Sequence, residues 1–152
     1  MIPEITFTVI KEGFGHFGTA SNNKMPSHTD TLGASISDDK KELTFFARKS
    51  LSEQVLANLA ENGRATIFIG VASHEAYQFK GQFVESRPLT SHEQELSEKN
   101  RNNFIEVMSG FGLPKSAIER LFGVEPDIGI TVRVEDIFVQ TPGPEAGKRL
   151  EI

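Results

Sequence analysis

Apolar and polar positions alternate in several short segments of the chain, a pattern that predicts β-strands. The pattern is regular in residues 128–134, where Ile and Val occupy every second position and Gly, Thr and Arg lie between them. Further strands are predicted over residues 14–21, 26–37, 43–47, 66–71 and 77–86. Turn-forming residues separate most of these segments. The pattern therefore predicts six strands with short connections.

Helices are predicted where a capping signal precedes apolar residues that recur every three or four positions. Residues 50–62 give the clearest case, because Ser50 and Glu53 have the spacing of a capping box. Thr90 and Glu93 repeat that spacing at the start of a second helix. Shorter helices are predicted over residues 3–12 and 114–122. Antiparallel strands with few helices indicate an α+β fold, a small barrel with peripheral helices.

Length and composition limit the organisation and the partners. The chain has 152 residues, 38% of them hydrophobic, which predicts a single domain over residues 1–152 with an extended tail over 141–152. Its net charge of -5 argues against nucleic acid or an anionic membrane as a partner. The absence of cysteine excludes disulfides and thiolate zinc sites. No signal peptide or membrane-spanning stretch is recognised, so we expect a soluble, cytoplasmic protein.

The junction between a predicted strand and the clearest helix carries the main chemical signal. Arg48 and Lys49 stand where the positive end of a helix dipole disfavours cations, by about 0.3 to 1 kcal/mol each. A bound anion would reverse this effect, because the two cations, the free amides and the Ser50 hydroxyl would all favour it. A phosphate fits this description. The alternative is that both side chains are simply solvated.

Several motifs along the chain resemble those of pyridoxamine 5'-phosphate oxidase-related, FMN-binding split-barrel proteins. They are Gly18-Thr19-Ala20-Ser21, Pro26, Phe45-Phe46-Ala47-Arg48-Lys49-Ser50, Asn58-Leu59-Ala60-Glu61-Asn62-Gly63, Gln140-Thr141-Pro142-Gly143-Pro144 and Ala146-Gly147-Lys148-Arg149. The resemblance covers nearly the whole chain. It implies a six-stranded Greek-key barrel and a homodimer that binds FMN at the interface between its subunits.

The resemblance also implies which residues contact FMN. Arg48, Lys49 and Ser50 match the phosphate-contacting residues, and the preceding Ala47 is also expected at the cofactor. The strand along the isoalloxazine ring is matched by Asp30, Thr31, Leu32 and Gly33. Gln54 is expected to reach the phosphate or the ribityl chain, or else to be a solvated helix residue. A glycine such as Gly33 equally marks a strand bulge.

The chain also departs from the vitamin-processing oxidases. Those enzymes have an Arg and a Lys on the second strand, where this chain has Thr31 and Ile36. They also open the helix with Ser-Arg-Lys, where this chain has Leu51-Ser52-Glu53-Gln54. These differences argue against oxidation of pyridoxamine phosphate.

Other candidate sites are weaker. His28 and Asp30 lie two apart on a predicted strand and share a face, but no third ligand stands at a recognisable spacing, so no metal site is predicted. Phe45, Phe46 and Phe122 are candidates for a flavin edge, although core packing is the preferred interpretation of each.

The leading functional hypothesis is an FMN-dependent oxidoreductase that uses hydride transfer at flavin N5, with a small-molecule electron donor and acceptor. The chain singles out no catalytic acid or base. The alternative is a non-catalytic module that binds flavin or haem, or relays electrons, on the same fold. A barrel that has lost its ligand is a third possibility.

Overall fold

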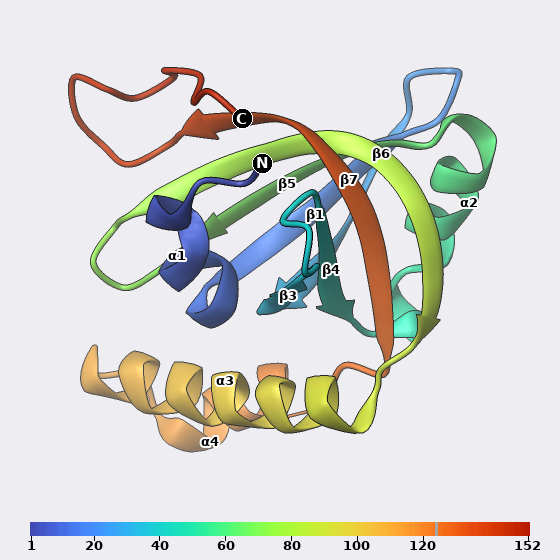
Figure 1. Ribbon diagram of the computed structural model, residues 1–152. Coiled ribbons are helices and arrows are strands. Elements are labelled where there is room, and N and C mark those ends of the chain that lie inside the picture. Colours follow the sequence, from blue (N-terminus) through green and yellow to red (C-terminus); the bar gives the residue numbers. More distant parts are fainter. Residues whose placement is uncertain (124) are drawn as a thin grey trace.

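The computed structural model describes residues 1–123 and 125–152, and its central feature is one antiparallel sheet of seven strands. In chain order these are β1 (Phe14–Ala20), β2 (Pro26–Leu32), β3 (Ala34–Ile36), β4 (Glu42–Ala47), β5 (Arg64–Gly70), β6 (Ala76–Pro88) and β7 (Ile128–Val139). Their order in the sheet is β2-β1-β5-β6-β7-β4-β3. The two edge strands, β2 and β3, follow one another in the chain, and the sheet curls into an open barrel (Figure 1).

The helices lie at the periphery of this barrel. They are η1 (Glu4–Thr6), α1 (Phe7–Glu12), η2 (Lys49–Leu51), α2 (Glu53–Asn62), α3 (Ser91–Gly110) and α4 (Lys115–Phe122). Figure 1 shows α3 running along one end of the barrel with α4 beside it, and α2 on another side. None of the helices in the described residues is long and apolar enough to cross a bilayer.

The predicted α+β class with antiparallel strands is confirmed, but the predicted count of six strands is wrong. The segment 26–37 was expected to be one strand, and it forms two, β2 and β3, on either side of Gly33. Gly33 has a φ of +81°, in the left-handed region that favours glycine, so the chain turns there and leaves the first edge of the sheet for the other. This turn accounts for the seventh strand.

The start of the best-defined helix also differs from the prediction. The capping box of Ser50 and Glu53 does not form, because residues 49–51 make a 3-10 turn and α2 begins at Glu53. The buried Ser52 hydroxyl donates to the carbonyl oxygen of Arg48 at 2.7 Å, which stabilises the tighter turn. By contrast, the predicted capping box of Thr90 and Glu93 is present at the start of α3.

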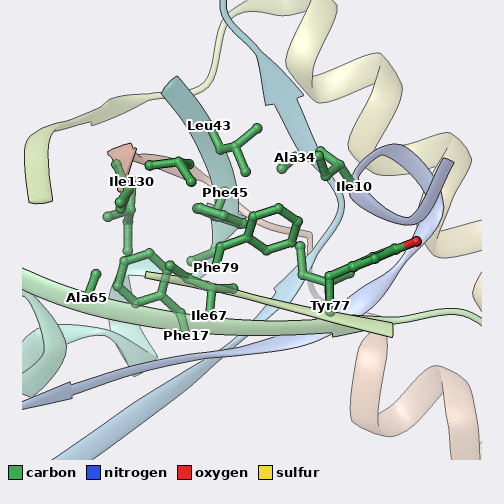
Figure 2. Close-up of a cluster of buried hydrophobic side chains, with 14 of the residues drawn as sticks. Ile10, Phe17, Ala34, Leu43, Phe45, Ala65, Ile67, Tyr77, Phe79 and Ile130 are labelled. Atoms are coloured by element: carbon green, nitrogen blue, oxygen red, sulfur yellow. The ribbon is translucent and has the colours of Figure 1, made fainter. Parts of the chain in front are cut away.

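The core fills the interior of the barrel with aromatic and branched side chains (Figure 2). Phe17 and Phe45 meet there edge to face, with ring centroids 5.6 Å apart. The preference for core packing is confirmed for Phe45 and Phe46, both fully buried. The alternation predicted for β7 is only partly observed, because Gly129 and Thr131 on its second face are buried as well.

Residues 141–152 turn back on the barrel. Phe138 of β7 forms a bridge with Arg149, and the amide of Leu150 donates to the carbonyl of Ile137 at 2.8 Å. β4 pairs with β7 only as far as Arg133, so the returning segment pairs with the part of β7 that β4 leaves open. The tail predicted to be extended thus returns to the sheet of its own chain.

Candidate functional site

The segment that leaves β4 carries the two cations identified in the sequence. Arg48 continues in extended backbone, with φ -95° and ψ 121°, and Lys49 and Ser50 follow in the 3-10 turn η2. Arg48 is half-buried, whereas Lys49 and Ser50 are exposed. Among the described residues, neither Arg48 nor Lys49 forms an ion pair through its side chain. Both cations therefore remain free to bind an anion.

An acidic side chain already occupies part of this junction. The Lys49 amide donates to Oδ1 of Asp127 at 2.7 Å, and the Asp127 amide donates to the carbonyl oxygen of Ala47 at 3.0 Å. Asp127 lies just before β7 and ties the start of that strand to the end of β4. One of the amides expected to bind a phosphate is therefore already bonded to a carboxylate. Binding of an anion at this position would therefore depend on the side chains of Arg48, Lys49 and Ser50.

A small hollow beside Arg48 brings together four of the residues predicted to lie along FMN. It is lined by Arg48, Asp30, Thr31 and Leu32, together with Phe14, Phe46, Phe122 and Pro126. The Thr31 hydroxyl is buried and has no hydrogen-bond partner among the described residues. A buried hydroxyl without a partner costs about 1 to 3 kcal/mol, so it fits a position where a ligand supplies the missing bond. We refer to this hollow, with Lys49 and Ser50, as the Arg48 site.

The remaining predicted contact residues lie elsewhere. Ala47 is buried in the core. Gln54 is exposed and donates to the side-chain oxygen of Asn58 at 3.0 Å. A Cβ on Gly33 would clash with the side-chain amide nitrogen of Asn100, so α3 already covers that side of the glycine. The structure thus gives Gly33 a role in the turn between β2 and β3 and in the packing of α3.

The hollow is too small to enclose a flavin within one chain. Its volume is about 20 Å³, enough for a single water molecule, whereas ligand pockets typically measure about 300 to 1,000 Å³. Phe14 and Phe122 form one side of it, and Phe104 packs against both rings, with centroid distances of 4.9 to 5.4 Å within the three. A ring that binds here would have to lie against the surface of the Arg48 site.

A larger groove lies on the other side of Phe14, between the barrel and α3. It has a volume of about 620 Å³ and is lined mainly by apolar side chains, with His74 and Glu75 at the loop between β5 and β6. Phe68, Phe104, Met108 and Phe111 form much of its apolar wall. Its size and lining would suit a flat organic ligand. No motif in the sequence pointed to this groove, because its walls come from segments far apart in the chain.

Comparison with known proteins finds its matches among solved structures. No family model matches the chain, and no curated protein sequence matches it. HupZ from Group A Streptococcus is 18% identical, with 97% of this chain and 100% of that chain covered and a TM-score of 0.57. A Lactobacillus delbrueckii protein described as a candidate pyridoxamine 5'-phosphate oxidase is 12% identical, with 90% and 93% covered and a TM-score of 0.52. An FMN-binding protein from Syntrophomonas wolfei is 8% identical, with 82% and 75% covered and a TM-score of 0.51.

The chain has the fold of pyridoxamine 5'-phosphate oxidase-like split-barrel proteins. The resemblance inferred from the motifs is thereby confirmed for the fold. At these identities the likeness extends to the split barrel alone, so the ligand must be argued from the side chains of this chain.

Two features of this split barrel were missed by sequence reasoning. Asp127 was not considered, because nothing in the sequence shows that the start of β7 meets the end of β4. Only His28 was grouped with Asp30 from the sequence, yet His16 also pairs with Asp30 across β1 and β2, and its Nδ1 lies 3.0 Å from the Asp30 carboxylate. The register of the predicted hairpin could have revealed this pair, because a hairpin that pairs Ala20 with Pro26 also places His16 opposite Asp30.

Proposed function

We propose that this protein binds FMN at the Arg48 site. The observation that carries the proposal is that Arg48, which has no ion pair among the described residues, lines the same hollow as Thr31, whose buried hydroxyl has no hydrogen-bond partner among those residues. A polyol or ring carbonyl of the ligand would supply the missing hydrogen bond, and the cations would bind its phosphate. The fold supports the assignment, since one protein that shares it is described as FMN-binding.

The phosphate would be held by side chains. Arg48 would donate from its guanidinium, Lys49 from its ammonium group and Ser50 from its exposed hydroxyl. The Lys49 amide does not take part, because Asp127 accepts its hydrogen bond. This arrangement has few fixed donors, so we expect weaker binding than in a site built from several preorganised amides.

A second subunit would complete the site. The hollow in one chain measures about 20 Å³, so most of a flavin bound there would be exposed to water. A partner subunit packed over the Arg48 site would cover the ring and exclude solvent. We therefore propose a homodimer with the flavin at its interface.

The bound flavin would supply hydride transfer, and the proposed activity is that of an oxidoreductase with small-molecule donor and acceptor. The residues of this chain would anchor the phosphate, orient the ring and exclude water. The test is to add reduced nicotinamide to the flavin-loaded protein. Bleaching of the visible flavin bands and their return in air support an oxidoreductase, and unchanged bands contradict it.

The groove beside α3 favours a second candidate, a non-catalytic module that binds a flat ligand such as flavin or haem. At about 620 Å³ it is large enough for such a ligand, and its lining is mainly apolar. Binding in the groove would depend on Phe104 and Phe111 and would not require a phosphate. This difference separates the two candidates.

Replacing both cations distinguishes the two sites. Arg48→Ala combined with Lys49→Ala should weaken FMN binding by about 2 to 4 kcal/mol, because two charged hydrogen-bond partners of the phosphate are lost. Riboflavin, which has no phosphate, should bind the wild-type protein more weakly than FMN and should be little affected by the double substitution. Quenching of flavin fluorescence measures all four affinities.

The matched control is Lys80→Ala with Lys99→Ala, which removes the same charge from exposed positions outside the Arg48 site. It should leave FMN affinity unchanged. Equal affinity of wild type and the Arg48–Lys49 variant for FMN would remove the phosphate assignment. Equal affinity of the wild type for FMN and riboflavin would favour the groove.

A further inference from the structure

Three side chains that can bind metal ions gather on the outer face of the hairpin formed by β1 and β2. His16 of β1 lies directly opposite Asp30 of β2, and His28 lies two residues before Asp30. Alternate residues of a strand point to opposite faces of a sheet, so these three share one face. The intervening Phe17 and Thr29 are buried, which identifies the face of the three ligands as the outer one.

The three groups are close enough to bind a single ion. One potential ligand atom from each of His16, His28 and Asp30 lies within 4.8 Å of the other two. The His16 Nδ1 and Asp30 Oδ1 atoms are 3.0 Å apart. Two ligand atoms about 2.1 Å from a tetrahedral zinc ion lie about 3.4 Å apart, so this pair already has nearly the required separation. Small rotations of exposed side chains would bring in the third ligand.

A hydrogen-bonded pair of His16 and Asp30 explains only part of this arrangement. The side chain of His28 forms no hydrogen bond with a described residue, yet its ring centroid lies 5.8 Å from that of His16. His28 is exposed, so packing does not hold it there. In the part of the chain that the structure describes, this is the one group of three such residues whose ligand atoms lie close enough to share an ion.

The chemistry of the three ligands indicates the class of ion. Two imidazoles and one carboxylate suit first-row transition metals such as Zn²⁺, Co²⁺ and Fe²⁺, whereas Mg²⁺ and Ca²⁺ prefer oxygen ligands throughout. The His16 and Asp30 side chains are 53% and 36% exposed, so an ion could enter directly from solvent. Water would complete its coordination, because three protein ligands leave at least one position open.

We propose that His16, His28 and Asp30 form a binding site for one divalent transition-metal ion, with Zn²⁺ as the expected occupant. The rigid antiparallel pairing of β1 and β2 holds the three ligands on one face, so the site does not require a flavin or a second subunit. Asp30 also lines the Arg48 site, so the two proposals share this residue, but metal binding by the flavin-free protein can be tested by itself.

Cobalt titration of the untagged, full-length, chelator-treated protein without flavin tests this proposal. We expect the visible absorption of bound Co²⁺ to saturate at one equivalent per chain, and Zn²⁺ to displace it. Mg²⁺ at the same concentration should not compete. Isothermal titration with Zn²⁺ gives the affinity directly.

Variants assign the site to these residues. His28→Ala should weaken Zn²⁺ binding by at least about tenfold, because it removes one of three ligands. His16→Ala and Asp30→Asn should do the same. His92→Gln removes an exposed histidine of α3 outside the cluster and should leave the affinity unchanged. Absence of Co²⁺ binding to the wild type, or the same Zn²⁺ affinity for wild type and His28→Ala, would overturn the proposal.

Discussion

At the scale of single residues, Thr31 is the most informative side chain of the Arg48 site. Its hydroxyl is buried and has no hydrogen-bond partner among the described residues. Thr44 offers a direct contrast, because its buried hydroxyl lies 2.9 Å from that of Thr131 and is paired with it. Both side chains carry a buried hydroxyl, but only that of Thr44 has a hydrogen-bond partner among the described residues.

Thr31→Val should therefore leave the free energy of unfolding unchanged or raise it by about 1 kcal/mol, since it removes an unsatisfied polar group at constant shape. It should also weaken FMN binding. Thr44→Val, the control, should lower the free energy of unfolding by about 1 to 2 kcal/mol, because Thr131 would lose its partner. Urea denaturation measures both. A destabilisation by Thr31→Val as large as that by Thr44→Val would mean that the Thr31 hydroxyl is satisfied within the chain.

At the scale of elements, Glu93 joins three segments at the start of α3. Its carboxylate forms two hydrogen bonds with Arg87 at the end of β6, accepts one from the Thr90 amide, and accepts another from the Ser35 hydroxyl of β3. The Arg87 guanidinium is the main cause that lowers the pKa of Glu93 from 4.5 to about 2, and burial opposes the shift. The capping box was visible in the sequence, whereas Arg87 and Ser35 were not assigned to it.

This carboxylate makes stability depend on pH in a defined direction. Because the pKa is lower in the folded state, the ionised Glu93 stabilises the fold above pH 4.5, and this stabilisation is lost as the pH falls from 4.5 towards 2. The shift corresponds to about 3 kcal/mol at neutral pH. Glu93→Gln should lower the free energy of unfolding by about 2 to 3 kcal/mol at pH 7.

The difference between wild type and Glu93→Gln should shrink by about 1 kcal/mol between pH 7 and pH 3.5. Urea denaturation at several pH values checks this. Glu98→Gln, an exposed position on the same helix, should show no comparable loss at either pH. A pH-independent difference for Glu93→Gln would exclude the ion pair as the source of the stabilisation.

At the scale of the whole molecule, large apolar side chains are exposed on and between α3 and α4. Phe111, Leu113 and Leu121 have exposed fractions of 67%, 47% and 64%. Leu121 adjoins Phe122, which lines the Arg48 site. Large exposed apolar groups that lie close together are typical of a surface that another subunit covers.

If this surface forms the dimer interface, the wild type should have twice the 16.8 kDa mass of the chain in light scattering after gel filtration. Leu121→Glu should yield a monomer, because it would place a charge in an apolar contact, and it should also weaken FMN binding. Ile5→Glu, at another exposed apolar residue, should remain dimeric. A monomeric wild type at tens of micromolar would contradict the proposed dimer.

Local patterns in the sequence determined much of the fold. The strands β1, β4, β5, β6 and β7 and the helix α3 were predicted from alternation and capping, because burial of one face imposes a period on the residues that form it. The motifs around Arg48 indicated the split barrel. The local spacing of Ser50 and Glu53, however, predicted a cap that did not form.

Tertiary structure decided what depends on contacts between distant segments. The Ser52 hydroxyl, buried against Thr29, stabilises a turn where the sequence predicted a helix. The Asp127 carboxylate accepts a hydrogen bond from the Lys49 amide because β7 starts beside the end of β4. Only strand pairing brings His16 opposite Asp30 and near His28, to the proposed metal site. Periodicity reveals which face a residue occupies, but only the folded chain determines which residues of different segments meet on that face.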